Sequence, residues 1–168
     1  MAARAVEIAD GLVAWVNDPA RVWPAPWGAG VAAERTWAVA ENYPDAAAIV
    51  NLFVRPDSRP ARSRIIRGAA RQQHVLTLEL FQRYGDGGDI PKVWFDDRAG
   101  LLEALADGIY DTLNGIGSGG LPGQPAGRLV YVEPENGVTI PSYADLLFQL
   151  DFRMFDGVIE VAFGECPG

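Results

Sequence analysis

The sequence predicts one α+β domain: a single-layer, mixed and mainly antiparallel β-sheet with two packed α-helices and long loops. Its 168 residues are enough for one domain and few for two. With 49% hydrophobic and 21% charged residues, the composition is typical of a chain that buries a core. Two segments repeat their apolar residues with a helical period, and several shorter ones alternate or are apolar throughout, as strands are. We therefore treat residues 1–168 as a single domain.

The two helices are predicted at residues 4–17 and 98–114. Apolar residues cover about half the circumference of the first, more than the usual stripe of roughly 100°, so a neighbouring subunit could cover part of it. Asp96 or Asp97 is a candidate N-cap of the second helix, and Gly115 is expected to end it. The buried stripe of the second helix comprises Leu102, Leu105, Ile109 and Leu113.

Strands are predicted, in chain order, at residues 36–40, 49–55, 74–84, 129–133, 146–155 and 158–163. Segment 49–55 is apolar on both faces, which indicates a central strand, and segment 74–84 alternates with leucines toward the core. Asp156 and Gly157 are predicted to form the tight turn of a closing hairpin. The first strand of that hairpin would bury Leu146, Phe148, Leu150, Phe152 and Met154.

Two loops carry distinctive residues. In residues 22–28, two prolines enforce extended backbone beside Trp23 and Trp27. These tryptophans either cover their own core or form a subunit contact, where Trp is enriched. Residues 115–127 form a flexible loop rich in Gly and Pro, which follows a helix rather than a strand. That position does not fit a phosphate-binding loop.

Charge is strongly segregated along the chain. Fourteen basic and twenty-two acidic residues give a net charge of −8, which argues against a surface that binds nucleic acid all over. Residues 56–73 are predicted as a long loop without apolar period. Six arginines against Asp57 give residues 55–71 a net charge of +5, which leaves −13 for the rest. The six are Arg55, Arg59, Arg62, Arg64, Arg67 and Arg71.

The second helix carries the opposite charge, since Glu103, Asp107 and Asp111 recur every four residues on one face. The arginine segment is either a partner-binding arm, a solvated arm or a DNA-phosphate contact, and the acidic face is either solvated or an interface. We select the partner-binding alternative for both. The candidate subunit or partner interface comprises Arg59, Arg62, Arg64, Arg67, Arg71, Glu103, Asp107, Asp111, Trp23 and Trp27.

The sequence offers little for catalysis. It has one histidine, His74, one cysteine, Cys166, and four serines without a recognisable nucleophile pattern. We therefore expect no catalytic residue, no metal site, no cofactor and no disulfide, with His74 and Cys166 structural. The enzymatic alternative is a small hydrolase or sugar-modifying enzyme that uses paired carboxylates, such as Asp151 with Glu160 across the predicted closing hairpin. No segment has the length and hydrophobicity of a membrane span, so we expect no membrane partner.

Four short segments resemble one known family. They are Ala40-Glu41-Asn42-Tyr43-Pro44-Asp45, Phe53-Val54-Arg55-Pro56, the arginine-rich stretch before segment 74–84, and Asp96-Asp97-Arg98-Ala99-Gly100-Leu101-Leu102. With the order of predicted elements, they resemble the tail terminator (tail completion) proteins of long-tailed bacteriophages and gene transfer agents. The order of elements covers residues 1–163, whereas the residue pattern covers about 37–113. The loop at 115–127 does not align with the family.

The resemblance implies a structural virion protein rather than an enzyme. Such a protein assembles as a ring of six subunits on the head-proximal end of the tail tube, ends tube growth and offers a docking surface to a head-completion or stopper protein. Genomic DNA would pass through the lumen without specific binding. The protein would be made in the bacterial cytoplasm and reside in the virion at the head–tail junction. The alternatives are another joining protein, a stopper or neck adaptor, or a nucleic-acid-binding regulator that uses the arginine segment.

Overall fold

The structure, a computed structural model, describes residues 3–24, 31–37, 50–56, 62–66, 69–85 and 87–167. Its elements follow one another as α1 (Arg4–Val16), β1 (Val31–Arg35), β2 (Val50–Pro56), β3 (Arg62–Ile66), β4 (Ala69–Arg83), α2 (Lys92–Leu113), the short 3₁₀ helix η1 (Ile116–Ser118), β5 (Arg128–Val132), β6 (Ser142–Tyr143), α3 (Leu146–Phe152) and β7 (Met154–Pro167). The α+β class expected from the sequence is confirmed.

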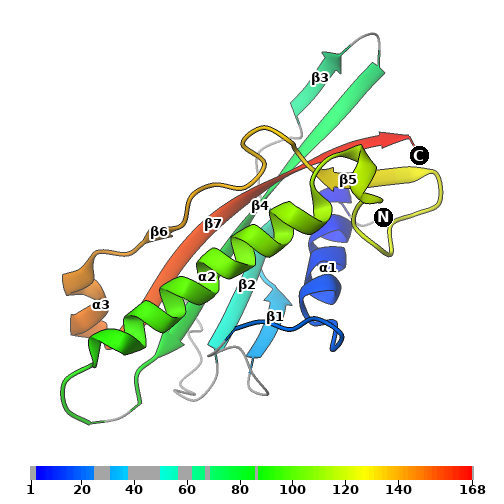
Figure 1. The fold of residues 1–168 in the computed structure, drawn as a ribbon. Helices are drawn as coiled ribbons and strands as arrows, with labels where there is room; N and C mark the ends of the chain where they lie inside the picture. Colours follow the sequence, from blue (N-terminus) through cyan, green and yellow to red (C-terminus); the bar gives the residue numbers. More distant parts are fainter. Residues whose placement is uncertain are drawn as a thin grey trace.

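All seven described strands belong to one curled mixed sheet (Figure 1). The main order is β1-β2-β4-β7-β5, while β3 pairs with β4 and β6 pairs with β7. Among the strand pairs of the described residues, β1–β2 is parallel and the others are antiparallel. The two longest strands, β4 and β7, pair from Gln72 opposite Glu165 to Arg83 opposite Met154. This long ladder is the backbone to which the other elements attach.

The helices α1 and α2 lie on the same side of the sheet and bury the main core (Figure 1). α1 packs on β1 and β2, and α2 packs on β7 and β5. The alternation of residues 74–84 is confirmed, because Leu76, Leu78 and Leu80 are fully buried. Each such side chain contributes about 1.5–3 kcal/mol when it leaves water. The predicted stripe of α2 is buried as well: Leu102, Leu105, Ile109 and Leu113.

The broad apolar face of α1 is covered largely by its own chain. Trp15 and Val16 are buried, and Val13 packs against the same core from the edge of the face. Trp23 returns over the helix, with its ring edge-on to Trp15 at 5.9 Å. Its indole N–H also donates to the carbonyl oxygen of Val16 at 3.2 Å. The loop therefore supplies most of the cover that we had expected from a neighbouring subunit.

Two expectations about the first half of the sheet were wrong. The strand expected at residues 36–40 lies instead at Val31–Arg35, where parallel pairing with β2 runs from Val50 to Val54; residues 38–40 lie outside the described part. The loop expected at residues 56–73 contains β3 and the start of β4. Closely spaced arginines masked the strand pattern, because backbone pairing with β4 sets these strands without an apolar period.

Helix α2 starts earlier than expected, at Lys92, so Asp96 and Asp97 lie inside it and neither is the N-cap. Pro91 occupies that position without a side-chain cap. Side-chain contacts connect the first turn to the sheet instead. The Arg98 guanidinium lies over the ring of Trp94, a residue of the first turn, and its Nε–H donates to the Gln82 side chain on β4 at 2.7 Å. At the other end, the expected stop is confirmed, since Gly115 adopts a φ of 68° just after the helix.

The predicted closing hairpin is wrong. Residues 146–152 form α3, whose N-cap Asp145 accepts hydrogen bonds from the backbone N–H groups of Leu147 and Phe148. β7 then runs without a turn through Asp156 and Gly157. Gly157 allows close packing there, because an added Cβ atom would lie 2.7 Å from Cδ2 of Leu102 on α2 and the leucine would have to shift. The glycine marks a helix–sheet contact, which a sequence pattern does not distinguish from a turn.

Candidate functional site

The arginine segment forms a β-hairpin, here called the basic hairpin, made of residues 62–66 and 69–73. Arg62 pairs with Gln73 and Arg64 with Arg71, so the three arginines occupy register positions on one face. Like charges directly opposite each other destabilise a strand pair, which favours an anionic partner. Figure 1 shows the basic hairpin extending past the rest of the sheet. Arg59 and Arg67 lie outside the described residues.

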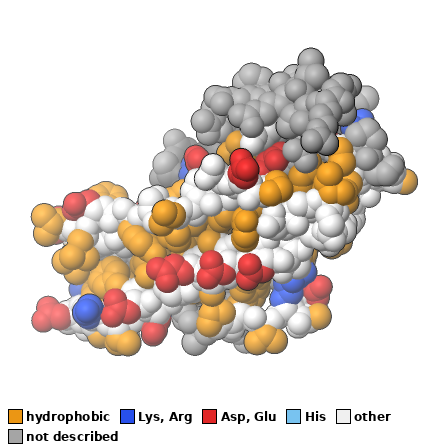
Figure 2. Space-filling view, turned by 45° about the horizontal axis from the view of Figure 1, so that its top comes forward, with side chains coloured by type: hydrophobic (Ala, Val, Ile, Leu, Met, Phe, Trp, Pro, Cys, Tyr) orange, Lys and Arg blue, Asp and Glu red, His pale blue; other side chains and the backbone are white. Residues whose placement is uncertain are grey.

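Glu103, Asp107 and Asp111 are exposed on α2, here called the acidic stripe. They lie opposite the buried leucines because both sets follow the helical repeat. Within the described part of the chain, no cation forms an ion pair with Asp107 or Asp111. Figure 2 shows acidic side chains in a row beside a band of hydrophobic ones. Among the described residues, the acidic stripe is thus an anionic surface without a cation paired to Asp107 or Asp111.

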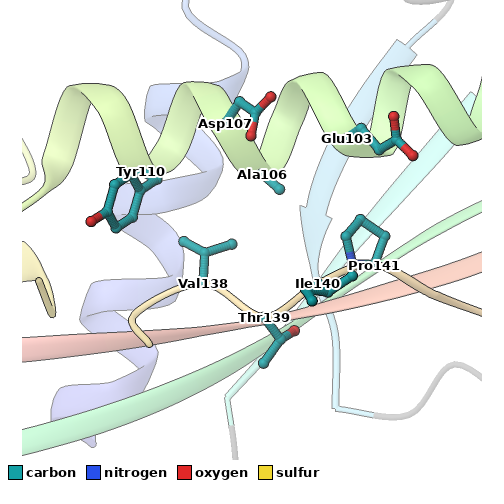
Figure 3. A pocket seen from close by; sticks show the side chains of 8 residues that line it. All are labelled: Glu103, Ala106, Asp107, Tyr110, Val138, Thr139, Ile140 and Pro141. Carbon is teal, nitrogen blue, oxygen red and sulfur yellow. The ribbon is translucent and has the colours of Figure 1, made fainter. Parts of the chain in front are cut away.

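A groove of about 420 Å³ runs between α2 and the segment that precedes β6 (Figure 3). Ala106 on α2 and Val138 approach each other across it, and Ile140 on the far wall is 89% exposed. The Tyr143 hydroxyl donates to Glu103 Oε1 at 3.5 Å; burial and the nearby Glu103 charge raise the pKa of this tyrosine. The groove is lined by Glu103, Ala106, Asp107, Tyr110, Val138, Thr139, Ile140 and Pro141.

Helix α3 presents an apolar surface that the sequence pattern had assigned to the core. Leu147 is 71% and Phe152 is 62% exposed, and Met154 alone of the expected buried series is buried. Monomers rarely expose such contiguous patches unless the patch has a partner. The exposed apolar residues of α3 are Leu146, Leu147, Phe148, Leu150 and Phe152. Together they form an exposed apolar surface on α3, which follows β6 in the chain.

The two tryptophans selected as interface residues have different outcomes. Trp23 is half-buried on its own core, and Gly108 on α2 leaves room for its ring: an added Cβ would lie 3.0 Å from it. This favours the own-core alternative for Trp23. Trp27 lies outside the described residues.

The residues considered for catalysis do not form the expected arrangement. Asp151 is exposed on α3 and Glu160 lies on β7, so they do not face each other across a hairpin. His74 is buried, with Nε2 3.1 Å from Glu165 Oε2, and Arg4 donates to the other oxygen of Glu165. Burial lowers the pKa of His74 against the opposing effect of Glu165. This network ties α1 to the ends of β4 and β7, as a structural histidine does.

A second buried cluster escaped the sequence analysis. Arg55 Nη2 lies 3.0 Å from Glu79 Oε2, and the Glu79 carboxyl is hydrogen-bonded to that of Asp156 on β7. Burial, followed by the Asp156 charge, raises the pKa of Glu79 to about 7. Burial raises the pKa of Asp156 as well. The only sequence signal is Phe81, which shares the face of Glu79 and indicates that this face is also covered.

The described residues contain no group of three or more His, Cys, Asp or Glu side chains that could hold a metal ion. None of the described helices is long and apolar enough to span a membrane. The chain matches no protein-family model, and a comparison with curated proteins finds no match to its sequence.

Proposed function

We infer that the protein is a structural virion component that forms a ring at the head-proximal end of a phage-like tail tube. There it ends tube polymerisation and joins the tail to the head–neck. The observation that carries this inference is the presence of two complementary, oppositely charged surfaces on one chain: the basic hairpin and the acidic stripe. Each carries like charges that repel one another when unpartnered.

Complementary surfaces at different places on a chain support head-to-tail association. β3 pairs only with β4 among the described strands, so the basic hairpin is a projecting element free to reach another copy. A contact between unlike patches of identical chains repeats around an axis, and it closes into a ring when the rotation permits. Charge complementarity also guides encounter and fixes register. A ring is the assembly that the resemblance to tail terminators implies.

The partners follow from this position. The ring would contact the tail-tube protein on one side and a head-completion or stopper protein on the other, with the genome passing through its lumen. A chain with a net charge of −13 outside residues 55–71 repels DNA, which favours free passage. The ring would be assembled in the bacterial cytoplasm. Another head–tail joining protein, a stopper or neck adaptor, would use the same surfaces.

The second candidate is a nucleic-acid-binding regulator, favoured by the three arginines at same-face positions of the basic hairpin. Phosphate contacts predict affinity that falls steeply as salt rises. A ring protein predicts weak DNA binding and an effect on tube growth.

Tube growth distinguishes the two. Tail-tube protein from the same genome is polymerised with and without this chain, and tube length is followed by light scattering. We expect sub-stoichiometric amounts to halt elongation, because a cap at one end stops addition there. Lys92→Glu is the control for a change of charge: this exposed residue at the start of α2 belongs to neither the basic hairpin nor the acidic stripe, so the variant should halt elongation as the wild type does. Unaltered growth, together with salt-sensitive binding to duplex DNA, would support the regulator instead.

A further inference from the structure

We propose that the groove between α2 and residues 138–141 receives the basic hairpin of a neighbouring copy of this chain. The inference rests on the proposed function, because it specifies the contact through which the ring closes. The occupant is a second copy, and it brings one hydrophobic side chain and several guanidinium groups into the groove.

The groove selects for an occupant of mixed character. Glu103 and Asp107 lie on the α2 side, and Asp111 continues the charge one turn further on. The floor and opposite wall are apolar at Ala106 and Ile140. Burial of apolar surface supplies affinity, and the carboxylates require cations at the rim. A purely basic segment would leave the Ile140 side chain exposed to water, and a purely apolar segment would leave the carboxylates of Glu103 and Asp107 without a cation.

The basic hairpin has this mixed character. Its sequence reads Arg62-Ser63-Arg64-Ile65-Ile66, and Arg67 follows. Register places Ile66 on the same face as Arg62, Arg64 and Arg71, since Ile66 pairs with Ala69 two positions beyond the Arg64–Arg71 pair. One face of the hairpin therefore combines three cations with an isoleucine at its tip end. This matches a groove that is acidic along one wall and apolar along the other.

The occupant comes from another copy because the basic hairpin extends past the sheet of its own chain (Figure 1). The backbone beside the groove is fixed to receive it: Val138 bridges to Val161, and Thr139 N–H donates to the Glu160 carbonyl at 2.9 Å. Ile140, the next residue, is nonetheless exposed. A rigid backbone that presents an exposed isoleucine beside two carboxylates is a preorganised receptor, which lowers the entropic cost of binding.

Disulfide capture tests the contact directly. Two differently tagged chains, both with Cys166→Ser, carry Ile66→Cys and Ile140→Cys respectively, so any mixed disulfide joins two copies. They are mixed on tail-tube ends and oxidised mildly. We expect a mixed dimer on a non-reducing gel. The matched control replaces Ile140→Cys by Val93→Cys. Val93 is also exposed, and it lies on α2 but outside the groove. The control yield should be about tenfold lower, which corresponds to about 1.4 kcal/mol.

Reversing the charges of the groove and of the basic hairpin gives a second test of the contact if one cysteine variant folds poorly. Glu103→Arg with Asp107→Arg on the receiving chain should lower the mixed-disulfide yield several-fold, and Arg62→Glu with Arg64→Glu on the donating chain should restore part of it. Ile65→Cys, at the alternate register position, is the second hairpin variant and should cross-link less well than Ile66→Cys. Circular dichroism of each variant confirms that it is folded.

The outcomes separate this inference from the proposed function. Rings on tube ends with equal cross-linking to positions 140 and 93 would overturn the groove contact while leaving the ring protein intact. Selective cross-linking to position 140 without rings or capped tubes would support the contact and contradict the proposed function. Cross-linking of Ile140→Cys to the tube protein in place of the second copy would assign the groove to that partner and overturn the inference.

Discussion

Glu79 shows how strand register can bring two acids together inside a protein. Its position on β4 lies opposite Val158 on β7, diagonal to Asp156, and the pair shares Arg55 as the nearby cation. Burial raises the pKa of both carboxyls against the opposing charge of Arg55, and the Asp156 charge raises the pKa of Glu79 further. The sheet is therefore most stable when Glu79 is neutral.

Replacing Glu79 by glutamine should remove the part of the pH dependence of folding stability that the Glu79 carboxyl causes. A carboxyl whose pKa rises from 4.5 to about 7 on folding contributes stability below about pH 4.5, and that contribution is lost as the pH rises through 7. The wild type should lose on the order of 3 kcal/mol relative to Glu79→Gln between pH 4.5 and 8. Urea unfolding of both proteins across this range measures the difference.

The comparison isolates Glu79 from His74, whose lowered pKa acts in the opposite direction. Burial makes protonation of His74 unfavourable, so its effect is a loss of stability as the pH falls below 6.5. The two residues are five positions apart on β4, about 17 Å, so their effects should add and His74 should cancel from the difference. A difference that stays constant with pH would contradict a raised pKa at Glu79.

Gly137 should tolerate no side chain, because a Cβ atom there would collide with the carbonyl oxygen of Glu133. We expect Gly137→Ala to cost about 1–3 kcal/mol and to displace the wall of the groove that follows it. Gly100 is the matched control: it lies in α2 with nothing within 4 Å of an added Cβ, so Gly100→Ala should stabilise by about 0.5–1 kcal/mol. Thermal unfolding compares the two, and equal effects would argue against the tight turn at Gly137.

At the scale of elements, a helix or strand was predictable where its own residues carry the apolar pattern of a buried face. α1, the central strand and the leucine alternation of β4 were predictable, because one side of each is buried against a continuous core. The basic hairpin was not, since its strands are set by pairing along β4 rather than by burial of a face. Nor was α3: residues 146–152 satisfy both an alternating and a helical pattern, and the Asp145 cap decides between them.

Phe152 and Met154 provide the test of α3 against a strand. The alternating pattern treats both as buried, whereas the structure leaves Phe152 62% exposed and Met154 3% exposed. Phe152→Ala should therefore change the free energy of unfolding by no more than about 0.5 kcal/mol, and Met154→Ala should cost about 2–5 kcal/mol. Urea titration gives both values. Losses of several kcal/mol in both variants would return residues 146–155 to a strand.

The groove itself was only half predictable. Its acidic wall followed from helical spacing, but its apolar wall depends on residues 138–141, which the tertiary bridge from Val138 to Val161 places beside α2. No local pattern in the sequence reports a contact between segments so far apart.

Charge reversal within the arginine segment, residues 55–71, tests the contact with the acidic stripe. Each exposed ion pair contributes only about 0–1 kcal/mol, so one Arg→Ala change should be nearly silent. Arg62→Glu, Arg64→Glu and Arg67→Glu together should leave the chain folded but block assembly, and Glu103→Arg, Asp107→Arg and Asp111→Arg should partly restore it. Size-exclusion chromatography with light scattering, in the presence of tube ends, follows assembly. Unchanged assembly in the triple glutamate variant would reject the charged contact.

Considered as a whole molecule, the chain separates its charges and its exposed apolar surface between distinct elements. The basic hairpin projects from one part of the sheet (Figure 1). The acidic stripe runs along α2, and α3, which carries exposed apolar residues, directly precedes β7. An assembly of copies gains complementary surfaces for every neighbour, which is the physical reason to expect a ring rather than a monomer.

Electron microscopy of the chain mixed with tail tubes tests the ring most directly. We expect class averages with a ring of about six subunits on one end of each tube and none on the other, because the two ends of a tube differ. A monomer in free solution is compatible with this result, provided that the ring forms on the tube. Tubes with bare ends at saturating protein, together with a monomeric mass in solution, would contradict the proposed function.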